Sequence, residues 1–171
     1  MLVRVSICLI LSLSVLFWPP VSLAADNPHG DAIVLPPLLP DQHGELGGLQ
    51  NQPQVLQLVI VVSAKRLRRL KPWERELRER YPDLDLLRVA DVPVSGSASV
   101  DDVAGKLRKR LPENVDVLID LDGAWAQRYA LDVSVPNLLL FAANRSLIAQ
   151  HAGFYQRQRF DMLAGDIDEA M

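Results

Sequence analysis

An almost unbroken apolar run at residues 55–62 passes directly into a helical pattern, and it constrains the fold more than any other stretch. Its order, Val-Leu-Gln-Leu-Val-Ile-Val-Val, predicts a strand buried on both faces in the middle of a sheet. Beyond Ser63, apolar residues recur at three- and four-residue steps over 65–81, which predicts one buried helix face. Pro72 lies inside this pattern, so we expect a kink or a break into two segments there. Such strand-to-helix junctions often hold the chemistry of α/β proteins, because backbone N–H groups point out of a helix start.

Residues 1–24 have the pattern of a secretory signal peptide. Arg4 is the only charge before a long apolar run, two prolines end that run, and Ala24 closes a Ser-Leu-Ala sequence with small residues at the cleavage positions. The alternative, a retained membrane anchor, would need an apolar run of about 20 residues, which is longer than this one. The predicted organisation is a signal peptide at 1–24, an extended Pro- and Gly-rich segment at 25–53 and one domain at 54–171. The expected location is the bacterial periplasm.

The cysteine content excludes several kinds of chemistry. The single cysteine, Cys8, lies in the predicted signal peptide, so the exported chain would have no thiol for a disulfide, a metal or a redox cycle. A net charge of −3 argues against a general nucleic-acid binder. His29 and His43 lie on a predicted loop with no other clustered ligand, which is more typical of surface residues than of a metal site. We therefore expect no metal and no cofactor.

The rest of the chain alternates between strand and helix patterns, which predicts an α/β domain with a mixed sheet. Ser99 is placed to cap one helix, with acidic residues in its first turn and basic residues in its last. Asn144 and Arg145 form a tight turn between the last two strands, which predicts a hairpin. The predicted strands are 84–92, 115–121, 138–142 and 146–151, and the predicted helices are 100–111, 124–131 and 154–171.

This order and four local sequences resemble the thioredoxin superfamily, and most of all its exported peroxiredoxin-like and cytochrome-maturation-like members. The resemblance covers the chain from Leu39 to the C-terminus. It implies a thioredoxin-like α/β fold, with a mixed central sheet flanked by helices. It also implies that Val135-Pro136 is the family's Val–cis-Pro pair. The four sequences are Leu39–Gly44 (Leu-Pro-Asp-Gln-His-Gly), Asp120–Tyr129, Val135-Pro136 and Leu138–Gly153.

The departure from the family lies at its redox motif. Members carry Cys-x-x-Cys at the strand-to-helix junction, with a proline five residues after the second cysteine. If Pro72 is that proline, Leu67 and Ala64 occupy the cysteine positions, and Ser63 replaces the usual tryptophan. The degenerate motif is therefore Ser63, Ala64, Lys65, Arg66 and Leu67. Because the family's reaction needs a thiolate, we expect neither thiol–disulfide oxidoreductase nor cysteine peroxidase activity.

The leading hypothesis is a redox-inactive protein that binds a protein or peptide of the cell envelope. A groove beside Pro136 would offer backbone for strand pairing with an extended peptide. Basic residues of the junction, among them Arg68, would form one rim and favour an acidic partner. No nucleic acid and no stable membrane insertion after signal cleavage are expected. The candidate groove residues are Val135, Pro136, Lys65, Arg66 and Arg69.

Three other interpretations remain open. The basic cluster at the junction is also what a solvated helix face would carry. A non-thiol enzyme, or an antioxidant-type activity on the same scaffold, would use Ser63, Lys65 or Asp120. Asp116, Asp120 and Asp122 would share one side of a strand and could form a carboxylate site, although Asp122-Gly123 is also a simple turn and Ser63 a simple helix cap. The proline-rich segment 25–53 would alternatively dock on another protein.

Overall fold

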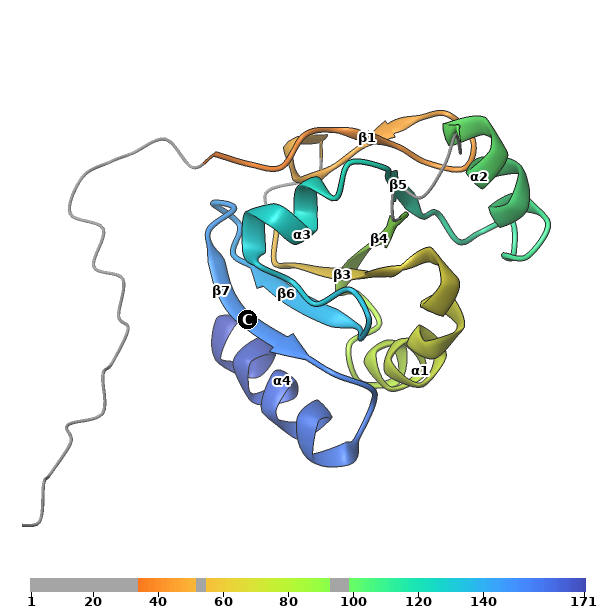
Figure 1. The fold of residues 1–171 in the computed structure, drawn as a ribbon. Helices are drawn as coiled ribbons and strands as arrows, with labels where there is room; N and C mark the ends of the chain where they lie inside the picture. Colours follow the sequence, from red (N-terminus) through yellow and green to blue (C-terminus); the bar gives the residue numbers. More distant parts are fainter. Residues whose placement is uncertain (1–33, 52–54, 93–98) are drawn as a thin grey trace, which may run out of the picture. The chain divides into compact units, whose positions relative to one another are not determined.

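A five-stranded mixed sheet forms the centre of the molecule in a computed structural model, which describes residues 34–51, 55–92 and 99–171 (Figure 1). The strand order is β5-β4-β3-β6-β7. β3 pairs in parallel with β4, β4 in parallel with β5, and the β6–β7 hairpin runs antiparallel to β3. The signal peptide predicted at 1–24 lies outside the described residues. The strands are β3 (Gln57–Ser63), β4 (Asp85–Asp91), β5 (Leu118–Asp120), β6 (Asn137–Phe141) and β7 (Leu147–Ala152).

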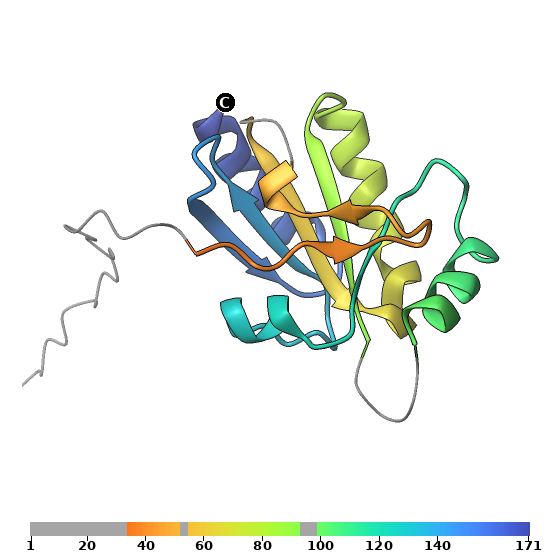
Figure 2. The ribbon, with the colours of Figure 1, turned by 90° about the horizontal axis from the view of Figure 1, so that it is seen from above.

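Helices cover both faces of this sheet. One face packs against α1 and α4, and near β5 against α2. The other packs against α3 and the hairpin of β1 (Leu39–Pro40) and β2 (Leu46–Gly47), which crosses the sheet in Figure 2. None of the helices in the described ranges is long and apolar enough to span a membrane. The helices are η2 (Ala64–Leu70), α1 (Lys71–Arg80), α2 (Val100–Arg108), α3 (Ala124–Tyr129) and α4 (Arg157–Ala170).

The central strand β3 is buried on both faces, as its sequence predicts. Every residue from Gln57 to Val62 is buried. Because side chains alternate along a strand, Ile60 and Val62 face α1 and α4, while Val59 and Val61 face α3. Both halves of the core therefore depend on this one strand.

The helical pattern at 65–81 breaks into two segments, as Pro72 predicts. η2 is a 3₁₀ helix over Ala64–Leu70, and α1 begins at Lys71. Pro72 lies in the first turn of α1, where its missing N–H has no helical partner to lose. Trp73 and Leu77 of α1 are buried against the sheet.

The segment before β3 has more structure than the extended lead-in expected at 25–53. Residues 34–51 contain β1 (Leu39–Pro40), β2 (Leu46–Gly47) and the short helix η1 (Leu49–Asn51). Leu39 and Leu49 are buried in the same core cluster as β3, so the compact unit begins before residue 54. Asp41 shapes the hairpin turn, because its Oδ1 accepts hydrogen bonds from the N–H groups of His43 (2.7 Å) and Glu45 (2.9 Å). The apolar contacts of two leucines therefore join this segment to the domain.

Local signals also place the later elements. Ser99 and Asp102 form a reciprocal capping box at the start of α2. Arg145 adopts a left-handed φ of 68° in the predicted β6–β7 turn. β5 is shorter than the strand predicted at 115–121, because it is an edge strand that pairs only with Val89–Asp91.

Candidate functional site

The β3–η2 junction places the degenerate motif at the carboxyl end of the central strand. Ala64 and Leu67 are half-buried and pack against the cluster formed by α2 and β5. Lys65 and Arg66 are exposed. The positions that would hold two cysteines thus carry a methyl group and an isobutyl group, and neither is a nucleophile. Ser63 occupies the cap position of η2, but its side chain makes no capping hydrogen bond, so the helix-cap interpretation is wrong.

Three polar residues end the parallel strands in one row. Ser63 is the register partner of Asp91, and Asp91 is the register partner of Asp120. All three lie on the face of the sheet that α3 covers. The residues two positions earlier, Val61, Val89 and Leu118, are packed on that face, and side chains two apart in a strand share a face. Ligands of open α/β sheets bind at such strand ends. Ser63, Asp91 and Asp120 are therefore the polar side chains at the strand ends where a ligand of this sheet would bind.

Asp120 has a structural role in this row. It is fully buried, and its carboxylate accepts hydrogen bonds from the backbone N–H groups of Ala124 (3.1 Å) and Trp125 (2.9 Å) at the start of α3. These bonds satisfy two donors that the first turn of a helix leaves without partners. The carboxylate that the enzyme hypothesis would use is thus occupied in holding α3.

Asp91 is the residue that the sequence reasoning missed. It is only 6% exposed, and burial, followed by the negative charge of Asp120, raises its pKa above the ordinary value of 3.8. A Cβ added to Gly123 would lie 3.4 Å from Oδ2 of Asp91, which places this carboxylate beneath the β5–α3 turn. The available signal was its position at the end of a predicted strand, but only the pairing with Asp120 reveals the neighbouring charge. Asp91 can hold or release a proton next to Ser63.

The carboxylate cluster proposed for Asp116, Asp120 and Asp122 does not form. β5 covers only Leu118–Asp120, so the other two aspartates lie outside the strand, and both are exposed. Asp116 instead lies 3.9 Å from Nε2 of His43. His29 lies outside the described residues, and no group of three or more metal-ligating side chains occurs in the described part of the chain.

The loop that carries Pro136 differs from the family pattern. The described residues contain no cis peptide bond, so the expected Val–cis-Pro pair is a trans pair here. Pro136 is buried and its C=O accepts from the N–H of Gly153 at 2.8 Å. The C=O of Val135 accepts from Nδ2 of Asn137 at 2.9 Å, and the N–H of Val135 donates to the C=O of Asp132 at 3.3 Å. An extended peptide could pair with Val135 only by displacing these bonds.

Four cations of η2, which we call the basic rim, lie beside this loop. They are all exposed: Lys65, Arg66, Arg68 and Arg69. Arg66 contributes to a lowered pKa of Asp132, behind the larger effect of two hydrogen bonds from Ser134. The guanidinium carbon of Arg69 lies 5.6 Å from the ring centroid of Phe154, which follows Gly153. Arg66 therefore lies near Asp132, four residues before Pro136, and Arg69 lies beside Phe154, next to the Gly153 that donates to Pro136.

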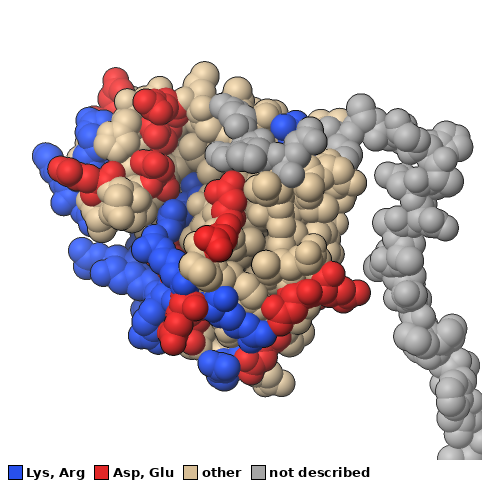
Figure 3. Space-filling model, turned by 180° about the vertical axis from the view of Figure 1, so that it is seen from behind, with Lys and Arg blue, Asp and Glu red and all other residues tan. Residues whose placement is uncertain are grey.

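Lys65 and Arg68 make no ion pair with any residue in the described ranges. Figure 3 shows Lys and Arg side chains gathered in a band on the side of the molecule where η2 and α1 lie. Acidic side chains flank the band. The junction thus offers unpaired positive charge in place of a nucleophile.

The structure of the chain is similar to those of several solved proteins. The exposed lipoprotein thioredoxin of Streptococcus pneumoniae matches with a TM-score of 0.60 and 19% identity, over 77% of this chain and 97% of that one. The N-terminal domain of PilB from Neisseria gonorrhoeae matches with a TM-score of 0.58 and 14% identity, over 78% and 89%. A thiol-disulfide oxidoreductase of Bacteroides fragilis matches with a TM-score of 0.53 and 14% identity, over 81% and 100%.

No protein-family model matches the sequence, and no curated protein matches it either. The strand order and these structural similarities define the chain as a thioredoxin-fold protein, which confirms the predicted fold. Within this class it lacks a cysteine pair, because its one cysteine is Cys8 and the motif positions hold Ala64 and Leu67.

Proposed function

We propose that this chain is an exported, redox-inactive thioredoxin-fold protein that binds an acidic segment of an envelope protein or peptide. The observation that carries the proposal is the basic rim, four exposed cations within the seven residues of η2, where a thiol-disulfide oxidoreductase would have its cysteines. Export is supported by the signal-peptide pattern of residues 1–24. It is supported further by the similarity to a protein described as an exposed lipoprotein.

The positive charge of η2 is the reason to expect an acidic partner. η2 contains no acidic residue, and the next acidic residue along the chain is Glu74 in α1. Exposed cations without partners attract an acidic segment and speed its association, and salt screens that attraction. Phe154, which is 39% exposed beside Arg69, adds an apolar surface next to the rim.

The contacts would be made by side chains. The backbone groups of Val135 and Pro136 already have partners inside the protein, so the strand pairing expected at this loop is not open to a peptide. The partner would instead lie across η2, with its carboxylates between Lys65 and Arg68.

A photo-crosslinking experiment tests this proposal. A benzophenone amino acid at position 68 should crosslink a defined envelope protein in intact cells, while the same group at Asp101 on α2 should not. A variant with Lys65→Gln and Arg68→Gln should bind that protein several-fold more weakly at low salt. The control variant Lys106→Gln with Lys109→Gln removes equal charge from α2 and its C-cap position and should bind normally. Equal crosslinking from both positions, or equal binding by both variants, would contradict the proposal.

Redox assays test the other half of the proposal. The protein should neither reduce insulin with dithiothreitol as electron donor nor consume hydrogen peroxide through a thiol, because Ala64 and Leu67 have no sulfur. Turnover that survives treatment with a thiol-alkylating reagent would point to a different reaction.

One observation favours a second candidate function, a thiol-independent reaction at the same strand ends. The raised pKa of Asp91 gives Ser63 a register partner that holds its proton to a higher pH than an ordinary carboxyl group does. If such a reaction exists, Asp91→Asn should abolish it, and the exposed Asp122→Asn should leave it unchanged.

A further inference from the structure

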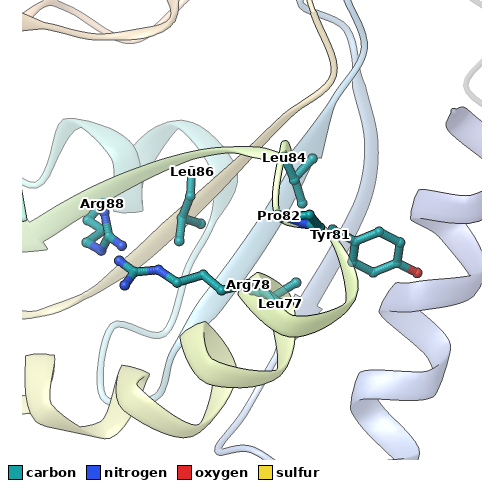
Figure 4. Close-up of a pocket in the computed structure, with 7 residues that line it drawn as sticks. All are labelled: Leu77, Arg78, Tyr81, Pro82, Leu84, Leu86 and Arg88. Atoms are coloured by element: carbon teal, nitrogen blue, oxygen red, sulfur yellow. The ribbon is translucent and has the colours of Figure 1, made fainter.

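A cavity of about 190 Å³ lies between α1 and β4, on the face of the sheet that α1 and α4 cover (Figure 4). Its apolar lining includes Leu77 from α1, Pro82 and Leu84 from the segment between α1 and β4, and Leu86 from β4. Tyr81 and Pro82 border the cavity where α1 ends, and the tyrosine ring points away from it toward α4, where its hydroxyl is hydrogen-bonded to the carboxylate of Asp168 at 2.6 Å. The cavity lies away from Ser63 and from the Pro136 loop, neither of which lines it.

Two guanidinium groups meet at one end of this cavity. In Figure 4, the guanidinium group of Arg78 points toward Arg88, Leu86 lies beside these two arginines, and Leu77 and Leu84 lie at the other end. Arg88 is 8% exposed, and its Nε donates to Oε1 of Glu74 at 2.5 Å. The site therefore has a charged end and an apolar end.

Glu74 neutralises only one of the two arginines. It lies four residues before Arg78 on α1, which is the spacing at which a helical ion pair forms. Its carboxylate is instead bound to Arg88, and Arg78 makes no ion pair within the described residues. The charged end thus keeps a net positive charge, and the planar fork of a guanidinium group suits a carboxylate in particular.

We infer that this cavity binds a carboxylate attached to a short apolar group, with the carboxylate between Arg78 and Arg88 and the apolar group on Leu77, Leu84 and Leu86. The volume limits the ligand, because a cavity of roughly 150 Å³ holds a benzene ring. One large apolar side chain or a short aliphatic chain fits this space. The ligand is thus either a free short-chain acid or the last residue of a peptide with an apolar side chain. This site is separate from the basic rim and does not depend on the proposed function.

Nuclear magnetic resonance titration of the full chain tests the inference. Hexanoate should shift the methyl signals of Leu77, Leu84 and Leu86 in a saturable way, and hexanamide, which lacks the charge, should bind at least tenfold more weakly. A blocked tripeptide that ends in leucine with a free carboxylate forms the second arm. Tighter binding of the tripeptide assigns the ligand to a chain end, and tighter binding of hexanoate assigns it to a free acid. Absence of saturable shifts with both probes overturns the inference.

Two variants connect the binding to the charged end. Arg78→Gln changes an exposed side chain without an ion pair, so the fold should remain, and hexanoate should bind about tenfold more weakly. Arg75→Gln removes the same charge from α1 but not from the cavity lining, and it should bind as the unmodified chain does. Equal weakening in both variants would overturn the inference, because it would indicate general attraction of anions by α1. Unchanged binding in Arg78→Gln would overturn it as well.

Discussion

Asp91 and Asp120 are register partners at the carboxyl ends of β4 and β5, and both are buried. The carboxylate of Asp120 accepts hydrogen bonds from two backbone N–H groups. The pKa of Asp91 is raised by burial and by the negative charge of Asp120. Two neighbouring carboxyl groups thus differ: Asp120 caps α3, and Asp91 is a buried acid with a raised pKa.

Asp91→Asn should stabilise the protein at neutral pH. The folded-state pKa of Asp91 lies above its unfolded value, so the folded state binds more protons. The contribution of Asp91 to stability is therefore complete below pH 3.8 and is lost as the pH rises through the folded pKa. Denaturant titrations from pH 3.5 to 8 should show the advantage of the variant growing with pH and then levelling off. An advantage that does not depend on pH would contradict this assignment.

Asp120→Ala should destabilise the protein by about 2 kcal/mol, because two buried N–H groups of α3 would lose their acceptor. Asp120→Asn keeps one acceptor oxygen and should cost less. The exposed Asp122→Ala is the matched control and should change stability by less than about 0.5 kcal/mol. Urea unfolding followed by the fluorescence of the tryptophans would measure all three. Equal losses for Asp120→Ala and Asp122→Ala would show that the cap is unimportant.

Glu74→Gln should separate stability from binding. It leaves Arg88 without its partner, which should cost about 2 kcal/mol, less than for a fully buried pair because Glu74 is partly exposed. The same change raises the positive charge at the end of the cavity, so hexanoate should bind more tightly. Thermal unfolding and hexanoate titration of the same sample check the two effects. Weaker hexanoate binding in a folded variant would contradict the charge argument.

Cysteines at positions 64 and 67 should form an intramolecular disulfide. Residues three apart in a 3₁₀ helix are eclipsed and separated by about 6 Å along the axis, which lies in the Cα range of disulfides. Mass spectrometry after alkylation, before and after reduction, should show one reversible disulfide in Ala64→Cys with Leu67→Cys. Ala64→Cys alone is the control. Exclusive dimer formation by the double variant would indicate that the junction cannot bring the two sulfur atoms together.

Prediction from the sequence succeeded where the determining interactions are local. The burial of β3 follows from its apolar run, the break before α1 from Pro72, and the start of α2 from Ser99 and Asp102. The pattern of the lead-in segment did not reveal its short elements or the burial of Leu49, which depend on packing against β3. The carboxylate site that the sequence left open as an alternative to a simple turn does not form, because β5 extends only as far as its pairing with Val89–Asp91.

The sequence alone determined the course of the central strand and the absence of sulfur from the motif, because both depend only on which residues occupy consecutive positions. The tertiary structure alone decided that Asp91 lies beside Asp120, that Arg78 and Arg88 share a cavity, and that the backbone of Val135 is already hydrogen-bonded. These relationships join residues from different strands, helices and loops. Strand register and helix packing set such distances, and no local pattern of residues contains them.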